Sequence, residues 1–281
     1  MWKKPLDFSS LTLTSYFLRM IFEETTQTMA TGTGFIYEYE DIKYLITNGH
    51  NVTRVNPETN QRLGKYAGFP TLIQTRAFIE VETDKDKLVP ELFAIDLYKD
   101  EYFTKPEWYV HPKFGYAVDV IAIPIDSHFK VPEHVRLFPI NNIKFDDDFD
   151  PTISDDVFVL GFPFDANPTG KLEMPIWKRG SIATEVDFDL NGLPKLLIDT
   201  ATRSGMSGSP VIYQRNGFHV HPSGNMGKNI FGRIRGFLGI YSGRLGADDN
   251  FKAQLGIVWK KSVIEEIIKG QKIGDIQFQS I

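Results

Sequence analysis

Short runs of β-branched and aromatic residues alternate with clusters of Gly, Pro, Asn and Asp along most of this sequence, and no feature constrains the fold more. Strand-length apolar runs between turn-forming residues are typical of all-β sandwiches and barrels. Asn191-Gly192 and Asn216-Gly217 are dipeptides that tolerate the positive φ of tight hairpin turns. A third hairpin turn is expected at Glu40-Asp41. The pattern therefore predicts an all-β chain.

One segment near the C-terminus has helical periodicity instead. We expect SVIEEIIKG to form a helix with Ser262 as its N-cap and Gly270 as its stop. The apolar residues of this segment recur at helical spacing: Val263, Ile264, Ile267 and Ile268. One amphipathic α-helix is thus predicted to close the fold.

An acidic stretch at 141–155 interrupts the strand pattern and divides the chain into two β-rich halves. We predict an N-terminal β domain at 1–140, a linker at 141–155 and a C-terminal β domain with the closing helix at 156–281. The run Asp146–Asp150 lacks the glycine and the distal glutamate of a helix-loop-helix calcium site. We interpret it as a solvated linker.

Composition excludes several classes of function. The chain has 31 Lys and Arg against 36 Asp and Glu, a net charge of −5, and no long basic cluster, which disfavours nucleic acid as a partner. It has no apolar stretch of the roughly 18 residues that a membrane span needs, so no membrane partner is expected. We recognise no signal peptide and, with zero cysteines, expect a cytoplasmic protein. Thiol catalysis is excluded, and no HExxH motif supports a metal, so no metal or cofactor is predicted.

The segment GMSGSPV, at 205–211, suits acyl transfer. Glycines beside Ser207 let the backbone bend so that the N–H groups of Gly205 and Ser207 can converge on one point. A developing oxyanion would be stabilised at that point. Ser207 is therefore a candidate nucleophile.

A serine hydroxyl needs a base within hydrogen-bond reach and a third group that orients the base. His50 follows a strand-like run in YLITNGHNV, and Asp119 precedes the apolar run VIAIPI, where a carboxylate needs a partner for its charge. His111 is the alternative base, but it precedes a proline and is expected to be a solvated surface residue. His219 and His221 are also expected at the surface.

Seven motifs occur in an order that resembles the chymotrypsin-like, or trypsin-like, serine proteases. The resemblance is strongest to the cysteine-free bacterial branch of heat-shock proteases and glutamyl endopeptidases, and it covers roughly residues 20–270. The motifs are GTGF at 32–35, TNGHNV at 47–52, HP at 111–112 with DV at 119–120, VFVLGFP at 157–163, RGSIATE at 179–185, GMSGSPV at 205–211 and GFLGIYSG at 236–243.

The resemblance implies two packed antiparallel β-barrels with the catalytic triad in the cleft between them. His50 and Asp119 would come from the first barrel and Ser207 from the second. The implied activity is hydrolysis of peptide bonds in a protein or peptide substrate through an acyl-enzyme, with 236–243 offering its backbone to the substrate as an added strand. Met206 stands where digestive members carry an aspartate, so any regulation would use loops, a substrate or a regulatory protein that the sequence does not identify.

The same family spacing implies which residues line the specificity pocket. The residue at position 241 is a tyrosine where the glutamyl branch has a histidine, while Thr202 and Arg203 keep an acidic preference open. No carboxylate lies at the expected bottom of the pocket, which disfavours substrates with Lys or Arg before the bond that is cut. We therefore expect a preference for a neutral, medium-sized side chain there. The implied wall consists of Ala201, Thr202, Tyr241, Ser242, Gly243 and Gly256.

Two other classes of function compete with a protease. A binding or scaffold protein could keep this fold without catalysis, although the intact triad and oxyanion loop argue against it. An esterase of the α/β-hydrolase type is disfavoured because Ser209 replaces the last glycine of G-x-S-x-G and because both partner residues precede the serine.

Overall fold

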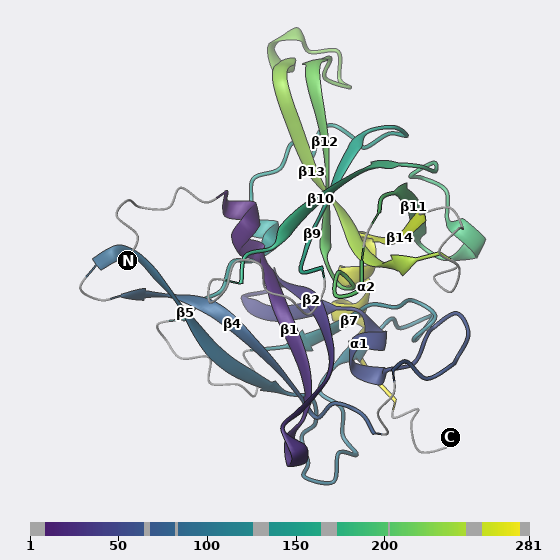
Figure 1. Ribbon diagram of the computed structural model, residues 1–281. Helices are drawn as coiled ribbons and strands as arrows, with labels where there is room; N and C mark the ends of the chain where they lie inside the picture. Colours follow the sequence, from purple (N-terminus) through teal and green to yellow (C-terminus); the bar gives the residue numbers. More distant parts are fainter. Residues whose placement is uncertain are drawn as a thin grey trace.

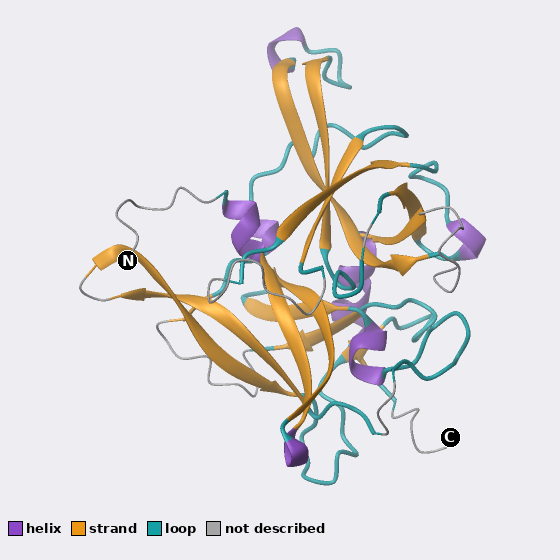
Figure 2. Cartoon of the chain, in the orientation of Figure 1, coloured by secondary structure: helices purple, strands orange, loops and turns teal. Residues whose placement is uncertain are grey.

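The computed structural model describes residues 9–64, 68–81, 84–125, 135–163, 173–201, 203–245 and 255–275. Strands dominate these residues and form two sheets, which lie in the lower and upper halves of the molecule in Figures 1 and 2. The prediction of an all-β chain with one closing C-terminal helix is confirmed.

The first sheet has nine strands, and its hydrogen-bonded order is β15-β6-β7-β3-β2-β1-β4-β5, with β8 pairing to β4. All of its strand pairs are antiparallel. Its strands are β1 (Ser15–Phe22), β2 (Gln27–Tyr39), β3 (Ile42–Thr47), β4 (Leu72–Val81), β5 (Asp84–Asp96), β6 (Tyr109–Val110), β7 (Ile121–Pro124), β8 (Val135–Arg136) and β15 (Lys272–Ile273).

The second sheet is a closed antiparallel barrel in the order β10-β11-β14-β13-β12-β9. Closure pairs each of its strands with two neighbours. Its strands are β9 (Asp156–Gly161), β10 (Ile176–Ile182), β11 (Lys195–Asp199), β12 (Pro210–His219), β13 (Ile230–Arg244) and β14 (Leu255–Lys260).

The turn predicted at Glu40-Asp41 is confirmed. Both residues have positive φ, 50° and 65°, and they join β2 to β3 at the pair Tyr39 and Ile42. Two positive φ values in a two-residue loop match the right-handed twist of the flanking strands.

The hairpin turn predicted at Asn216-Gly217 is wrong. Strand β12 continues through both residues, with Asn216 opposite Arg233 and Gly217 opposite Gly232, and the chain reverses only beyond His219. The ladder to β13 therefore overrides the local preference of the dipeptide.

The dipeptide Asn191-Gly192 does form a turn, with φ of 57° and 72°, but the predicted hairpin around it is wrong. Strand β10 ends at Ile182, so the residues from 185 to 190 lie outside the ladder. The turn lies within the long loop 183–194 that connects the paired strands β10 and β11, so it is not the tight two-residue turn of a hairpin.

Two α-helices and several 3-10 turns complete the described chain. The longer helix, α2 (Ser262–Gly270), buries the four apolar residues that the sequence predicts, although its N-cap is Lys261 and Gly270 is its last residue. No helix in the described ranges is long and apolar enough to span a membrane. The other elements are α1 (Gly49–Thr53), η1 (Ser10–Thr14), η2 (Glu23–Thr25), η3 (Ile140–Asn142), η5 (Leu190–Gly192) and η6 (Met226–Lys228).

The last described residues return to the first sheet. Strand β15 pairs with β6, and α2 contacts both β6 and β7. The segment 141–155 lies between β8 of the first sheet and β9 of the barrel. The strands of the first sheet precede residue 141 except for β15, and the strands of the barrel follow residue 155. The division into domains at 1–140 and 156–281 stays a prediction.

The hydrophobic core has three parts. Among the described residues, one cluster is formed by side chains of the first sheet and its neighbouring segments, and another lies inside the barrel. The third lies between the sheets, where Phe35, Phe237 and Ile264 belong to the same buried cluster. Helix α2 therefore stabilises the packing of one sheet on the other.

Replacing Ile264 tests this role of α2. Ile264 is fully buried, so Ile264→Ala removes apolar contacts and leaves a cavity that should lower the free energy of unfolding by about 2–5 kcal/mol. Ile153→Ala is the matched control, because Ile153 is 41% exposed and its truncation should change stability by only about 0.5 kcal/mol. Urea unfolding measures both values, and equal midpoints for the two variants would contradict the prediction.

Candidate active site

His50 lies in the short helix α1, directly after strand β3. Gly49 lets this helix approach Asp119, because a Cβ at position 49 would lie 3.3 Å from Asp119 Oδ1. The helix ends where Arg54 adopts a left-handed conformation and its N–H donates to the carbonyl of His50. The turn thus fixes the backbone that carries the imidazole.

Asp119 is a buried carboxylate that precedes β7, and it accepts hydrogen bonds from three donors. Its Oδ2 accepts from His50 Nδ1 at 2.6 Å and from Ser242 Oγ at 2.5 Å, and its Oδ1 accepts from the His50 backbone N–H at 2.9 Å. Charge-assisted hydrogen bonds compensate for the removal of the carboxylate from water. Because Nδ1 donates to Asp119, Nε2 of His50 is left as a hydrogen-bond acceptor.

Ser207 lies in a tight loop that the first sheet holds in place. Thr33 of β2 donates its N–H to the Ser207 carbonyl at 2.8 Å and its hydroxyl to the Gly205 carbonyl at 2.9 Å. Asn51 of α1 donates to the same Ser207 carbonyl at 3.3 Å. At Gly208, with φ of 88°, a Cβ would collide with the Thr33 carbonyl, so only glycine fits there.

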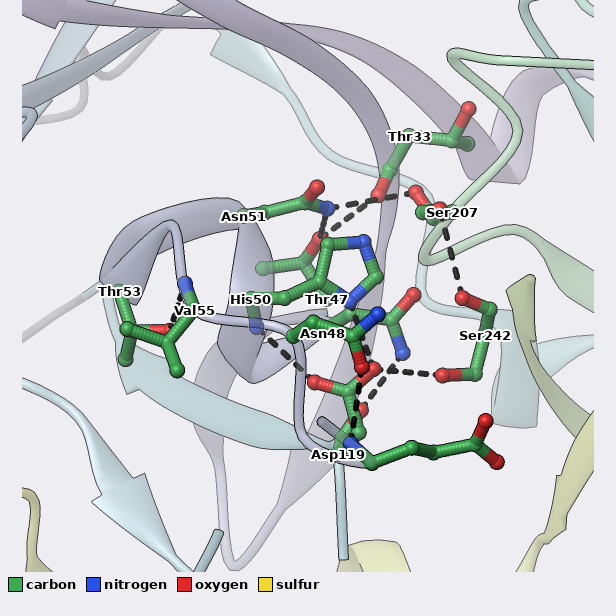
Figure 3. Close-up of polar contacts among 12 residues, drawn as sticks. Thr33, Thr47, Asn48, His50, Asn51, Thr53, Val55, Asp119, Ser207 and Ser242 are labelled. Carbon is green, nitrogen blue, oxygen red and sulfur yellow. Dashed lines mark hydrogen bonds and ion pairs between the residues drawn. The ribbon is translucent and has the colours of Figure 1, made fainter. Parts of the chain in front are cut away.

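The three candidate triad residues gather in one place (Figure 3). The His50 ring lies between Asp119 and Ser207 in this view. Ser207 Oγ donates to the Ser242 carbonyl at 3.4 Å, and in the described part of the chain no hydrogen bond joins it to His50. The structure therefore joins His50 to Asp119 directly and connects Ser207 to the same cluster through Ser242.

Ser242 has a contact that the sequence did not reveal. The family resemblance implies that it lines the specificity pocket, whereas its hydroxyl donates to Asp119 and its carbonyl accepts from Ser207. The only signal in the sequence was indirect, because a buried carboxylate requires more donors than one histidine provides.

The two N–H groups proposed for the oxyanion hole belong to Gly205 and Ser207. Gly205 has φ of 91°, and its carbonyl is fixed by Thr33. Neither of the two N–H groups donates to a backbone acceptor among the residues that the structure describes.

The residues of the implied specificity pocket differ in their positions. Tyr241 is buried in the barrel core, and its ring lies so close to Gly256 that a Cβ there would be 2.6 Å from Tyr241 Cε2. Ala201 is half-buried at the end of β11, Gly243 continues β13 with φ of 140°, and Thr202 lies outside the described residues.

A cleft of about 460 Å³ opens beside His50 and Asp119. Its lining mixes apolar side chains with the cations Lys195 and Arg244 and the anion Glu58. Lys195 Nζ lies 3.9 Å from Glu58 and 5.3 Å from the centre of the Trp259 ring. A second hollow, of about 390 Å³, shares His50 and Asp119 but extends toward Tyr116 and Lys272.

The other described histidines lie apart from this site, and the expectation that they are solvated surface residues is wrong. His111 is buried, with Nε2 3.0 Å from Glu266 of α2 and Nδ1 accepting two backbone N–H groups. His219 and His221 are buried against Phe149. Within the described ranges no group of three His, Cys, Asp or Glu could hold a metal ion.

Truncating Ser242 tests whether its hydroxyl stabilises the buried carboxylate. Ser242→Ala removes one of the three donors to Asp119, so the free energy of unfolding at neutral pH should fall by about 1–3 kcal/mol. Ser10→Ala removes an exposed hydroxyl and serves as the control. Both are measured by urea unfolding, and a Ser242→Ala variant as stable as the control would show that the hydrogen bond contributes nothing.

Comparisons with known proteins identify a family for this chain. A family model described as a trypsin-like peptidase domain matches residues 32–218. The chain is also similar to two crystal structures of the Rv3671c protease, both in an inactive form. One shares 15% identity over 92% of this chain and 88% of that one, with a TM-score of 0.40. The other, a serine-to-alanine mutant from M. tuberculosis H37Rv, shares 17% identity over 92% and 86%, with a TM-score of 0.41. Comparison with curated proteins gives no match.

Proposed function

This chain belongs to the family of trypsin-like peptidase domains, and on that premise we propose that it is a serine endopeptidase with Ser207, His50 and Asp119 as its triad. The proposal rests on the orientation of the His50 imidazole, which Asp119 holds through a hydrogen bond. His50 donates from Nδ1 to a buried carboxylate, which leaves Nε2 as a base beside the loop that carries Ser207. The motif order further suggests the cysteine-free bacterial branch of the family.

The proposed reaction has two halves. Ser207 Oγ attacks the carbonyl carbon of the peptide bond while His50 Nε2 accepts the hydroxyl proton. The N–H groups of Gly205 and Ser207 stabilise the oxyanion, and the imidazolium then protonates the leaving amine. Water attacks the resulting acyl-enzyme by the same route, with His50 again accepting and returning the proton. Asp119 stays ionised throughout and stabilises the imidazolium.

One local movement precedes this chemistry. Ser207 Oγ donates to the Ser242 carbonyl at 3.4 Å, a long hydrogen bond that costs little to break. Rotation about χ1 of Ser207 would turn the hydroxyl toward His50 Nε2. Catalytic hydrogen bonds of this kind often tighten only when the substrate is bound.

The backbone of β13 offers a place for an extended peptide. Strand β12 pairs with β13 only as far as Ile240, opposite Pro210, while Tyr241, Gly243 and Arg244 pair with β14 on the other side and Ser242 lies at a register shift. Among the described residues, no strand pairs with the other edge of Ser242–Arg244, which lines the cleft that contains His50. A substrate strand can add to this edge, a shorter segment than the 236–243 that the resemblance implies.

A fluorophosphonate probe tests the nucleophile, because it bonds only to an activated serine hydroxyl and loses fluoride. We expect labelling of the unaltered chain, and its reduction on the order of 10³-fold in Ser207→Ala and in His50→Ala. Ser204→Ala is the matched control, since Ser204 is an exposed serine in the same loop and should leave labelling intact.

Circular dichroism would establish that each variant is folded. Equal labelling of the Ser207→Ala variant and the unaltered chain would overturn the assignment. A folded chain that no probe labels would favour the alternative, a protein that keeps the fold for binding.

Substrate preference is tested by digestion of a peptide library. None of the implied pocket residues is a carboxylate, and in the adjacent cleft the cations Lys195 and Arg244 accompany the anion Glu58, which lies 3.9 Å from Lys195. We therefore expect cleavage mainly after neutral residues, with Lys and Arg disfavoured at the bond that is cut. Mass spectrometry of the products identifies the cut sites, and a predominance of Lys and Arg would contradict this pocket assignment.

A further inference from the structure

The strands β12 and β13 extend beyond the barrel as a two-stranded finger (Figure 1, top). Pairing of β12 with β9 ends at Gln214, and pairing of β13 with β14 begins only at Gly239. Beyond Gln214, therefore, the two strands pair only with each other. We call residues 215–235 the hairpin finger.

The two faces of the finger have different surroundings. On one face, Tyr213 donates its hydroxyl to the Phe149 carbonyl at 2.5 Å, and Arg215 forms an ion pair with Asp155 at 2.5 Å. His219 stacks edge-on against Phe149 on that same face. The segment 146–155 thus covers this face.

The opposite face carries an exposed aromatic pair. Phe218 and Phe231 are directly opposite in the register, so both side chains lie on one face. Their exposed fractions are 62% and 88%. Val220 and Met226 add 63% and 84% exposed side chains in the connection between the strands.

At the end of the finger, His221 is buried against Phe149, whereas the four apolar side chains remain exposed. At Gly217, Gly224 and Gly232, an added Cβ would meet no atom within 4 Å. Together the four exposed side chains offer an apolar surface of roughly 400–500 Å². An apolar patch of this size on an exposed projection indicates an interaction site.

The charge of the finger is opposite to that of the whole chain. The chain has a net charge of −5, yet residues 214–244 contain no Asp or Glu. Lys228 and Arg233 are exposed, and Arg233 lies on the aromatic face, because it pairs with Asn216 two residues from Phe218. The exposed Asp148 lies on the covered side, where it meets His221 at 3.2 Å.

We propose that the hairpin finger docks on the surface of an anionic lipid bilayer, with Phe218, Phe231 and Met226 inserted at the level of the headgroups. Apolar side chains combined with neighbouring cations are the chemistry that such a surface binds. This differs from our expectation that the chain has no membrane partner. That expectation rested on the absence of a spanning segment, which peripheral docking does not need.

A protein partner fits the finger less well. A protein interface of standard size buries about 800 Å² on each partner and needs a complementary surface around its apolar centre. The finger is also a narrow projection, and the cavities found in the described residues lie elsewhere in the molecule. Insertion into a bilayer needs only the tip and no complementary surface.

The test uses the full chain and vesicles of phosphatidylcholine alone or mixed with phosphatidylglycerol. We expect sedimentation with the anionic vesicles only, reduced on the order of tenfold or more in Phe218→Ser/Phe231→Ser and in Lys228→Glu/Arg233→Glu. Phe188→Ser is the matched control, because Phe188 is 67% exposed in a distant loop and its loss should leave binding unchanged.

Insertion is measured by the fluorescence of a tryptophan introduced at the end of the finger. Phe231→Trp should gain fluorescence that brominated phosphatidylcholine quenches in anionic vesicles, whereas Phe188→Trp should not. Thermal unfolding shows that the exposed substitutions leave the fold intact. Hydrolysis of a soluble peptide should also be unchanged, which separates this proposal from the proposed protease activity.

Three results would overturn the proposal. In the first, the unaltered chain binds the vesicles no more strongly than the double variant Phe218→Ser/Phe231→Ser does. The second is equal binding to neutral and anionic vesicles. The third is a dimer in sedimentation velocity that the same double variant dissociates, which would assign the aromatic face to a second copy of this chain.

Discussion

The buried carboxylate of Asp119 is the interaction on which the rest of the site depends. Asp119 precedes β7 of the first sheet and accepts from His50 of α1, which follows β3 of that sheet, but its third donor is Ser242 of the barrel. A buried charge is tolerated only when its hydrogen bonds are made, so the two sheets must be packed before the carboxylate is satisfied. The imidazole is consequently oriented only in the assembled fold.

The same dependence holds for the loop that carries Ser207. Thr33 and Asn51, both from the first half of the chain, hold its backbone, while Gly208 donates to the Tyr241 carbonyl within the barrel. Helix α2 adds apolar packing between the two sheets. Hydrogen bonds across the junction thus set the geometry, and the hydrophobic cluster behind them contributes most of the stability.

Strand β13 connects the two surfaces that we propose to be functional. Its first residues form one side of the hairpin finger, and its last residues, Ser242–Arg244, border the cleft at His50. The stretch from Ile230 to Ser242 spans at most about 40 Å at 3.3 Å per residue. A bilayer at the finger would therefore lie within about 40 Å of the residues that border the cleft.

The sequence by itself determined the features that a few neighbouring residues control. The positive φ of Glu40 and Asp41, the amphipathic spacing of 262–270 and the strand-rich pattern all follow from local preferences, and the structure has each of them. The motif order also identified His50 and Asp119, which the fold brings to 2.6 Å across 69 positions of sequence.

The tertiary structure alone decided the features that depend on distant partners. Asn216-Gly217 has the composition of a turn but lies within a strand, because pairing with Arg233 and Gly232 outweighs the local preference. His111 is buried because Glu266, 155 positions away, supplies its partner. Ser242 contacts Asp119 for the same reason. Burial and hydrogen bonding depend on which groups packing brings together, and no short segment of sequence contains that information.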